Sequence, residues 1–229
     1  MLQQSHTMVK TIEKTLRLNY LVYTPSQVGE QTGKKWPLVI FLHGAGERGT
    51  DLNLVKKHGL TMMAEQGEKF PFILAAPQCP VESFWDRQLD ALDGFLSELL
   101  RTYPIDTERI YLTGLSMGGF GTWHWAERRP NAFAAIAPIC GGAMPMLGFP
   151  ERIKKIKHVP VWAFHGDSDD VVPLSSSQEL VDVLRENNGN VRFTVYEGVG
   201  HDSWTRAYKE PELIPWLLKQ RNEDFKFEV

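Results

Sequence analysis

Continuous apolar runs recur along this chain of 229 residues, separated by segments with a different hydrophobic period. Runs of this kind are typical of parallel strands that are covered on both faces. They occupy residues 37–42, 72–77, 133–139 and 159–164. Strict alternation of apolar and polar residues predicts a half-buried strand over residues 15–23. Shorter β-branched and aromatic runs predict strands over residues 109–113 and 192–196.

Helical spacing of apolar residues predicts helices between most of these strands. The expected helices cover residues 89–102, 120–129 and 211–220, with a short irregular helix within 52–66. Ser176 and Glu179 have the spacing of a capping box, which predicts the start of a helix that ends at residues 187–189. The alternation predicts one doubly wound, mostly parallel α/β sheet with helices on both faces. Residues 1–229 are expected to form a single domain without a large cap domain.

Composition narrows the classes of partner. The net charge is −3, from 25 basic and 28 acidic residues, and no basic run occurs, which argues against nucleic acid as a partner. No apolar run approaches the roughly 20 residues of a membrane span. The first residues lack the pattern of a signal peptide, which favours the cytoplasm, or an exported protein whose signal has been removed. Cys79 and Cys140 lack metal-ligand spacing, and no glycine-rich nucleotide motif is present, so no cofactor or metal is expected.

The strongest chemical motif is the sequence Gly-Leu-Ser-Met-Gly at residues 114–118. A predicted strand precedes it and a predicted helix follows, which is the setting of a serine nucleophile on a sharp strand-to-helix turn. Glycine is needed at the flanking positions because a Cβ there would collide with neighbouring elements. The helix N-terminus adds a positive partial charge where an oxyanion would form. Ser116 is therefore the candidate nucleophile.

Two further groups complete the requirements of acyl transfer at serine, which needs a base and an acid that orients it. His201 follows the last predicted strand and is the candidate base. Residues 167–170 follow the strand before it and offer Asp167, Asp169 and Asp170 as the acid. Asp167, next to a glycine, is expected to cap its own turn. All these groups lie at carboxyl ends of strands, where functional groups gather in such sheets.

Together these motifs resemble the α/β-hydrolases, in particular the lidless carboxylesterase, phospholipase-type esterase and dienelactone-hydrolase-like group. The matching stretches are residues 42–46, 114–119, 165–173 and 200–201. The resemblance implies Asp169 as the orienting acid, because the pattern resembles His-Gly-x-x-Asp-x-Val-Val-Pro. Dienelactone hydrolases proper have a cysteine where this chain has Ser116, so their specific activity is not implied.

The resemblance also suggests the groups around the nucleophile. Its oxyanion hole would use the backbone N–H groups of Met117 and Ala45. His43 and His165 are expected to be structural. Glu47 and Arg48 are expected to form ion pairs that fix their loop, with a contact to a polar part of the substrate as the alternative. Two tryptophans lie close to the motifs and are candidates for the substrate pocket, with simple packing as the alternative for each: Trp85 and Trp204.

The expected activity is that of a metal-free serine hydrolase that cleaves carboxylic esters through an acyl-enzyme. The substrate would be a small-molecule or oligosaccharide-linked ester. A thioesterase or a peptidase with the same triad is an alternative within the enzymes. A binding protein that has lost the chemistry is a further alternative, which the presence of all three triad residue types disfavours.

Overall fold

The structure is a computed structural model that describes residues 3–11, 13–29, 33–144 and 148–227. Seven strands form a single sheet with the order β1-β3-β2-β4-β5-β6-β7. β1 is antiparallel to β3, and the remaining pairs are parallel. The strands are β1 Asn19–Tyr23, β2 Trp36–Leu42, β3 Ile73–Gln78, β4 Ile105–Leu115, β5 Ala135–Ile139, β6 Val161–Gly166 and β7 Val191–Tyr196.

The strand order reverses between β2 and β4. From β2 the chain adds β3 on one side, and then returns to place β4 on the other side. Loops after strands on the two sides of such a reversal diverge, which opens a crevice at the carboxyl edge of the sheet. The loops that leave β2 and β4 at this edge carry Ala45 and Ser116.

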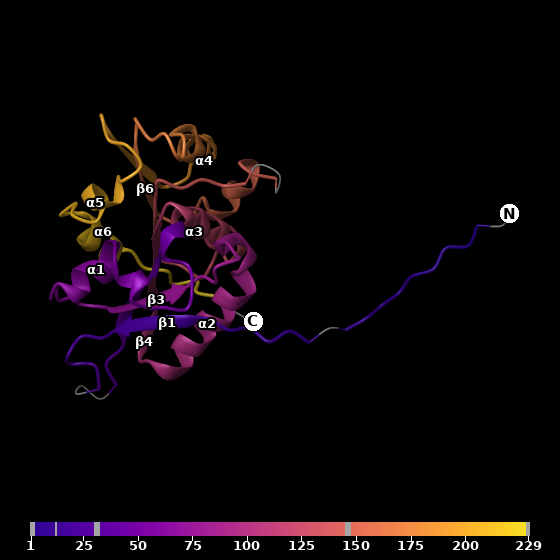
Figure 1. Ribbon diagram of the computed structural model, residues 1–229, viewed down its shortest axis with the longest axis horizontal. Helices are drawn as coiled ribbons and strands as arrows, with labels where there is room; N and C mark the ends of the chain where they lie inside the picture. The colour runs from indigo at the N-terminus through magenta and orange to yellow at the C-terminus, as the bar shows by residue number, and fades with distance from the viewer. Residues whose placement is uncertain (1–2, 12, 30–32, 145–147, 228–229) are drawn as a thin grey trace.

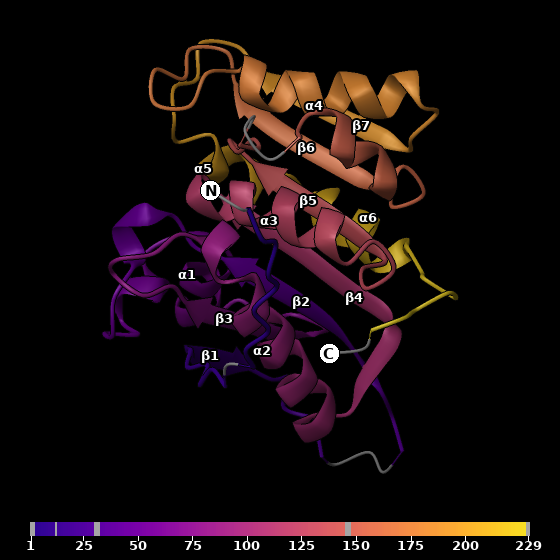
Figure 2. The ribbon, with the colours of Figure 1, turned by 90° about the vertical axis from the view of Figure 1, so that its right-hand side faces the viewer.

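Helices cover both faces of the sheet, as Figure 1 shows edge-on and Figure 2 from the side of α2 and α3. One apolar cluster joins α2, α3 and α4 to one face of the strands, and a second joins α1, α5 and α6 to the other face. The helices are α1 Gly59–Glu65, α2 Leu89–Thr102, α3 Met117–Arg128, α4 Ser175–Glu186, α5 Trp204–Ala207 and α6 Leu213–Lys219. Short 3-10 helices are η1 Ala45–Glu47, η2 Leu54–Lys56, η3 Trp85–Arg87 and η5 Glu151–Ile156.

This architecture confirms the predicted doubly wound α/β sheet. Residues 145–147 of the irregular segment 143–158 lie outside the described residues, and the described remainder holds η5 and no separate cap domain. Among the described helices, none has the length and apolar character needed to cross a membrane.

Several predicted element starts are wrong, including that of α3, which begins at Met117 rather than at residue 120. Residues 15–18 are not part of β1, because Asn19 already pairs with Gln78, the last residue of β3, so no neighbouring backbone remains for the residues before it. The capping box is also absent. Ser176 lies inside α4, the N-cap is Leu174, and no side chain caps this helix start. The predicted strand over 109–113 extends on both sides to form β4.

Candidate active site

Ser116 occupies a strained turn between β4 and α3. Its φ of 52° and ψ of −118° lie in a region that non-glycine residues rarely adopt, and such strain concentrates at functional sites. A Cβ at Gly118 would lie 1.9 Å from Leu42 O, and one at Gly114 would lie 2.4 Å from Gly118 O. Both flanking positions therefore require glycine, as the sequence predicts. The serine stands at the N-terminus of α3, where the helix dipole favours negative charge.

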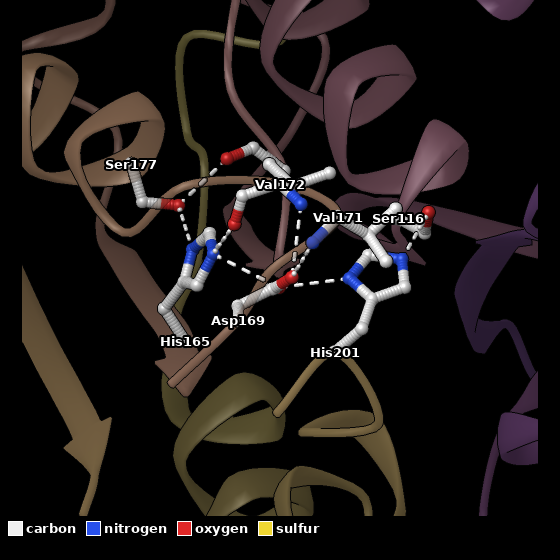
Figure 3. Close-up of polar contacts among 8 residues, drawn as sticks. Ser116, His165, Asp169, Val171, Val172, Ser177 and His201 are labelled. Atoms are coloured by element: carbon white, nitrogen blue, oxygen red, sulfur yellow. Dashed lines mark hydrogen bonds and ion pairs between the residues drawn. The ribbon is translucent and has the colours of Figure 1, made fainter. Parts of the chain in front are cut away.

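The structure brings Ser116, His201 and Asp169 together in one hydrogen-bonded line, as Figure 3 shows. His201 Nε2 lies 2.9 Å from Ser116 Oγ, and His201 Nδ1 lies 2.8 Å from Asp169 Oδ2. Because a carboxylate only accepts, Nδ1 donates to Asp169 and Nε2 is left to accept from the serine hydroxyl. The Asp169 side chain is fully buried, whereas 18% of the His201 side chain remains exposed, so water can reach the imidazole.

Asp169 is held by more than His201. Its Oδ1 accepts the N–H groups of Val171 at 3.0 Å and Val172 at 2.9 Å. Burial alone would raise the pKa of Asp169, but the hydrogen bonds from His201 and from these two N–H groups outweigh it and hold the pKa below its usual range. The carboxylate is therefore ionised at neutral pH.

The other two aspartates of the loop point elsewhere. Asp170 is exposed. Asp167 does not cap its own turn, in contrast to the sequence-based expectation. Its Oδ1 accepts the N–H of Gly198 at 2.8 Å, which ties the acid loop to the loop that carries His201.

These two loops touch backbone to backbone at Gly166. A Cβ at this position would lie 2.1 Å from Val199 O, and Ser168 N–H donates to the same carbonyl at 3.1 Å. The close approach brings the acid and the base within hydrogen-bonding reach. It also explains why residue 166, the glycine of the His-Gly motif, cannot carry a side chain.

Ala45 and Met117, the candidate oxyanion donors, begin η1 and α3 respectively. The η1 loop lies directly against the nucleophile strand, since a Cβ at Gly44 would lie 2.9 Å from Leu115 Cδ1. The residue before Ala45 thus lies against the residue before Ser116, and Met117 follows Ser116 directly in the chain.

His43 fixes the orientation of the Ala45 N–H through the preceding carbonyl. His43 Nε2 accepts Cys79 N–H at 3.0 Å, so Nδ1 carries the hydrogen and donates to Gly44 O at 2.6 Å. Gly44 C=O and Ala45 N–H belong to one planar trans peptide and point in opposite directions. Burial lowers the pKa of His43 to about 4, which keeps the ring neutral in this arrangement. The predicted structural role of His43 thus has a definite contact.

Arg48 and Glu47 contact the surrounding loops rather than each other. Arg48 Nε donates to Ala45 O at 2.9 Å, and its Nη1 donates to Ser83 O at 3.3 Å. Glu47 is buried, with its Oε1 3.8 Å from His58 Nε2. These contacts fix the loop. Arg48, however, bonds to backbone carbonyl groups and does not form the predicted ion pair.

A cavity of about 300 Å³ opens beside the nucleophile. Its lining is largely aromatic and thioether, and consists of Phe84, Trp85, Asp86, Arg87, Ser116, Met117, Phe120, His124 and Met144. Apolar side chains around a few polar groups are typical of small-molecule sites.

The two tryptophans proposed from the sequence differ in position. Trp85 lines the cavity, is fully buried, and donates from Nε1 to His43 O at 3.0 Å. Trp204 is absent from the cavity lining, and its ring stands perpendicular to that of His201 at a centroid distance of 5.3 Å. Trp204 therefore packs against the candidate base instead.

Sequence reasoning missed most of the cavity. Phe84, Phe120, His124 and Met144 come from three separate segments, and Trp85 was the only pocket candidate from the sequence that lines the cavity. His124 is buried and its Nε2 accepts Met144 N–H at 3.3 Å, which attaches the cavity rim to α3.

One group of metal-ligand residue types occurs in the described part of the chain. Cys140, Asp169 and His201 have donor atoms within 4.8 Å of one another. Asp169 and His201 bond to each other, and burial raises the pKa of the Cys140 thiol to about 12, which disfavours the thiolate that a metal needs. Cys140 and Cys79 are both free and buried. The absence of a metal stays a prediction.

Known proteins with similar sequences are hydrolases of esters and thioesters. A bifunctional acetylxylan esterase/xylanase of Neocallimastix patriciarum is 31% identical over 66% of this chain, which spans 21% of that protein. Acyl-protein thioesterase 1 of Neurospora crassa is 27% identical over 80% of this chain and 86% of its own length. The crystal structure of a thermostable esterase superposes with a TM-score of 0.76 at 38% identity, over 89% of this chain and 59% of that one.

The sequence model of the phospholipase/carboxylesterase family matches residues 82–210, which is more than half of the chain. This segment holds the nucleophile turn, the acid loop and the base. With the sheet and the hydrogen-bonded line of Ser116, His201 and Asp169, it shows that the chain belongs to the phospholipase/carboxylesterase family of the α/β-hydrolase fold.

Proposed function

We propose that Ser116, His201 and Asp169 carry out the ester hydrolysis of this family, with Ala45 and Met117 as oxyanion donors. The observation that carries this proposal is the pair of hydrogen bonds at 2.9 and 2.8 Å that links the three side chains. Because the Asp169 carboxylate can only accept, His201 carries its hydrogen on Nδ1. This tautomer leaves Nε2 of His201 free to take the serine proton.

The reaction then has two stages. His201 Nε2 removes the hydroxyl proton while Ser116 Oγ attacks the ester carbonyl carbon, and the oxyanion binds the two backbone N–H groups. The imidazolium returns its proton to the leaving alcohol, and an acyl-enzyme remains on Ser116. His201 next takes a proton from water, which attacks the acyl carbon. The proton passes back to Ser116 as the acid leaves.

The cavity beside Ser116 could hold an apolar portion of the substrate. Its roughly 300 Å³ suits an aromatic acid or a medium-length acyl chain better than an acetyl group alone. We propose an ester of this kind, small or attached to an oligosaccharide, as the substrate class.

A single domain over residues 1–229 and a cytoplasmic location stay proposals from the sequence.

A thioesterase is the second candidate, because the thioesterase relative aligns over most of both chains. Matched oxoester and thioester substrates with the same acyl group separate the two, since only the leaving group differs. A kcat/KM at least tenfold higher for the oxoester supports the carboxylesterase. The reverse ratio supports the thioesterase, and leaves the triad assignment intact.

Replacement of the nucleophile tests the residue assignment. Ser116→Ala should lower kcat by up to about 10⁶, a scale taken from a serine-protease triad. Turnover of p-nitrophenyl esters by the folded variant measures this loss. Activity above roughly 1% of the wild type would exclude Ser116 as the nucleophile, given that scale.

A further inference from the structure

A second histidine contacts the same oxygen of Asp169 as the candidate base. His165 lies at the end of β6 and is completely buried. Its Nε2 is 3.3 Å from Asp169 Oδ2 and 2.9 Å from Val172 O. Its Nδ1 is 2.8 Å from Ser177 Oγ in α4, as Figure 3 shows. His201 approaches Asp169 Oδ2 from the opposite side.

The neighbours of His165 decide where its hydrogen lies. Val172 O and the carboxylate Oδ2 can only accept, so a ring with its hydrogen on Nδ1 alone would turn a lone pair toward two acceptors. Two arrangements avoid this repulsion. The neutral ring carries Nε2–H and accepts the Ser177 hydroxyl, or the ring carries both hydrogens and Ser177 donates to Gly141 O at 2.8 Å. Both place Nε2–H between Val172 O and Asp169.

Burial favours the neutral arrangement. It lowers the pKa of His165, although the Val172 carbonyl and the Asp169 carboxylate act in the opposite direction. Among the described titratable groups, His201 interacts with both His165 and Asp169, and the Cys140 thiol interacts with Asp169. Asp202 acts on the same thiol.

We propose that His165 is a positioning residue: its Nε2–H is hydrogen-bonded to Val172 O at 2.9 Å, is shared with Asp169 Oδ2 at 3.3 Å, and thereby helps to fix the carboxylate that orients His201. This inference rests on the proposed roles of Asp169 and His201. Oδ1 has two backbone donors, whereas Oδ2 contacts only the two histidines within the described part of the chain. Without His165, the carboxylate keeps more charge on Oδ2 and loses a lateral restraint.

The expected kinetic effect has two parts. His165→Phe keeps a ring of similar shape and removes the donor. It should lower kcat about tenfold, the usual scale of a hydrogen bond to a charged group, with little change in KM. The acid limb of kcat/KM, which a histidine base produces, should move to higher pH. The reason is that a more negative carboxylate stabilises the imidazolium of His201.

Two further variants separate positioning from a general loss of packing. His165→Gln retains an amide donor and should recover most of kcat and the wild-type acid limb. Tyr111→Phe is the matched control, because it removes one buried hydroxyl that donates to Gln220 O at 2.9 Å, far from the acid loop. It should leave both the limb and kcat unchanged.

An unmoved acid limb and an unchanged kcat in folded His165→Phe would overturn the proposal, as would an equal loss in Tyr111→Phe. If His165→Phe does not fold, nitrogen-15 NMR of the wild type decides. His165 should show a protonated Nε2 at neutral pH, and a bare Nε2 would refute the inference. Fluorophosphonate labelling of wild-type Ser116 keeps the two proposals distinct. Without labelling the proposed function fails, whereas labelling with an unmoved limb removes only the role of His165.

Discussion

The three aspartates of the acid loop have distinct surroundings, although the sequence places them within four residues. Asp169 alone contacts His201, Asp167 ties two loops together, and Asp170 is exposed. Asp169→Asn should therefore lower kcat by about 10⁴, because an amide can present its NH₂ group to the imidazole and favour the wrong tautomer. Steady-state kinetics of the folded variant measures this loss.

The neighbouring variants serve as controls for that change. Asp167→Asn should lower stability by about 1–2 kcal/mol, since it weakens the bond to Gly198 N–H, and should retain most of kcat. Asp170→Asn should be nearly neutral in both. Melting temperatures and kcat for all three variants give the comparison. A large kinetic loss in Asp170→Asn with none in Asp169→Asn would show that the acid has been assigned to the wrong residue.

Close contact between the acid loop and the base loop depends on one missing side chain. Gly166→Ala would put a Cβ 2.1 Å from Val199 O, so the loops must separate. The variant should lose about 3 kcal/mol of stability and at least tenfold in kcat, because His201 moves away from Asp169. Urea unfolding and steady-state kinetics measure the two effects.

Gly200→Ala is the matched control in the same pair of loops. Its Cβ would meet Ser168 O at 3.7 Å, an ordinary contact distance. Stability should stay within about 0.5 kcal/mol of the wild type. Equal losses in the two variants would mean that the loops tolerate separation and that the contact at Gly166 has no special importance.

The central strands were predictable because burial on both faces leaves a continuous apolar run, as in residues 37–42. The start of β1 was not, since it depends on where β3 ends rather than on the alternation in residues 15–18. The start of α4 also follows from context. The acid loop, held by Asp169 at Val171 and Val172, leads directly into the helix without a side-chain cap.

Site residues divide in the same way. Ser116, Asp169 and His201 lie in short local motifs that are typical of a catalytic triad, so the sequence was enough to propose them as site residues. The cavity could not be read from the sequence, because Phe84, Phe120 and Met144 meet only after the chain folds.

Buried neutral histidines should make the stability of the protein depend on pH. Burial lowers the pKa of His43 from 6.5 to about 4, and it also lowers the pKa values of His124 and His165. Between pH 6.5 and about 4, His43 binds a proton in the unfolded chain but not in the folded protein. The free energy of unfolding is therefore highest above pH 6.5 and decreases as the pH is lowered. The lowered pKa of His43 alone should decrease the free energy of unfolding by about 3 kcal/mol over this range, at 1.36 kcal/mol per pKa unit.

Urea unfolding at several pH values between 7 and 4 measures this dependence. His43→Gln can still donate and accept but does not titrate, so its stability should fall less steeply over the same range. The slopes matter here, because the substitution changes the absolute stability as well. Parallel curves for the two proteins would mean that His43 is not kept neutral by the fold.

Covalent labelling with a fluorophosphonate tests whether Ser116, activated by His201, is the reactive group of this protein. The reagent phosphonylates an activated serine, and peptide mass spectrometry locates the adduct. We expect one adduct per chain, on the peptide that contains Ser116, with loss of esterase activity in proportion to labelling and no adduct in Ser116→Ala. Complete inactivation with Ser116 unmodified, or full activity with Ser116 modified, would contradict this assignment.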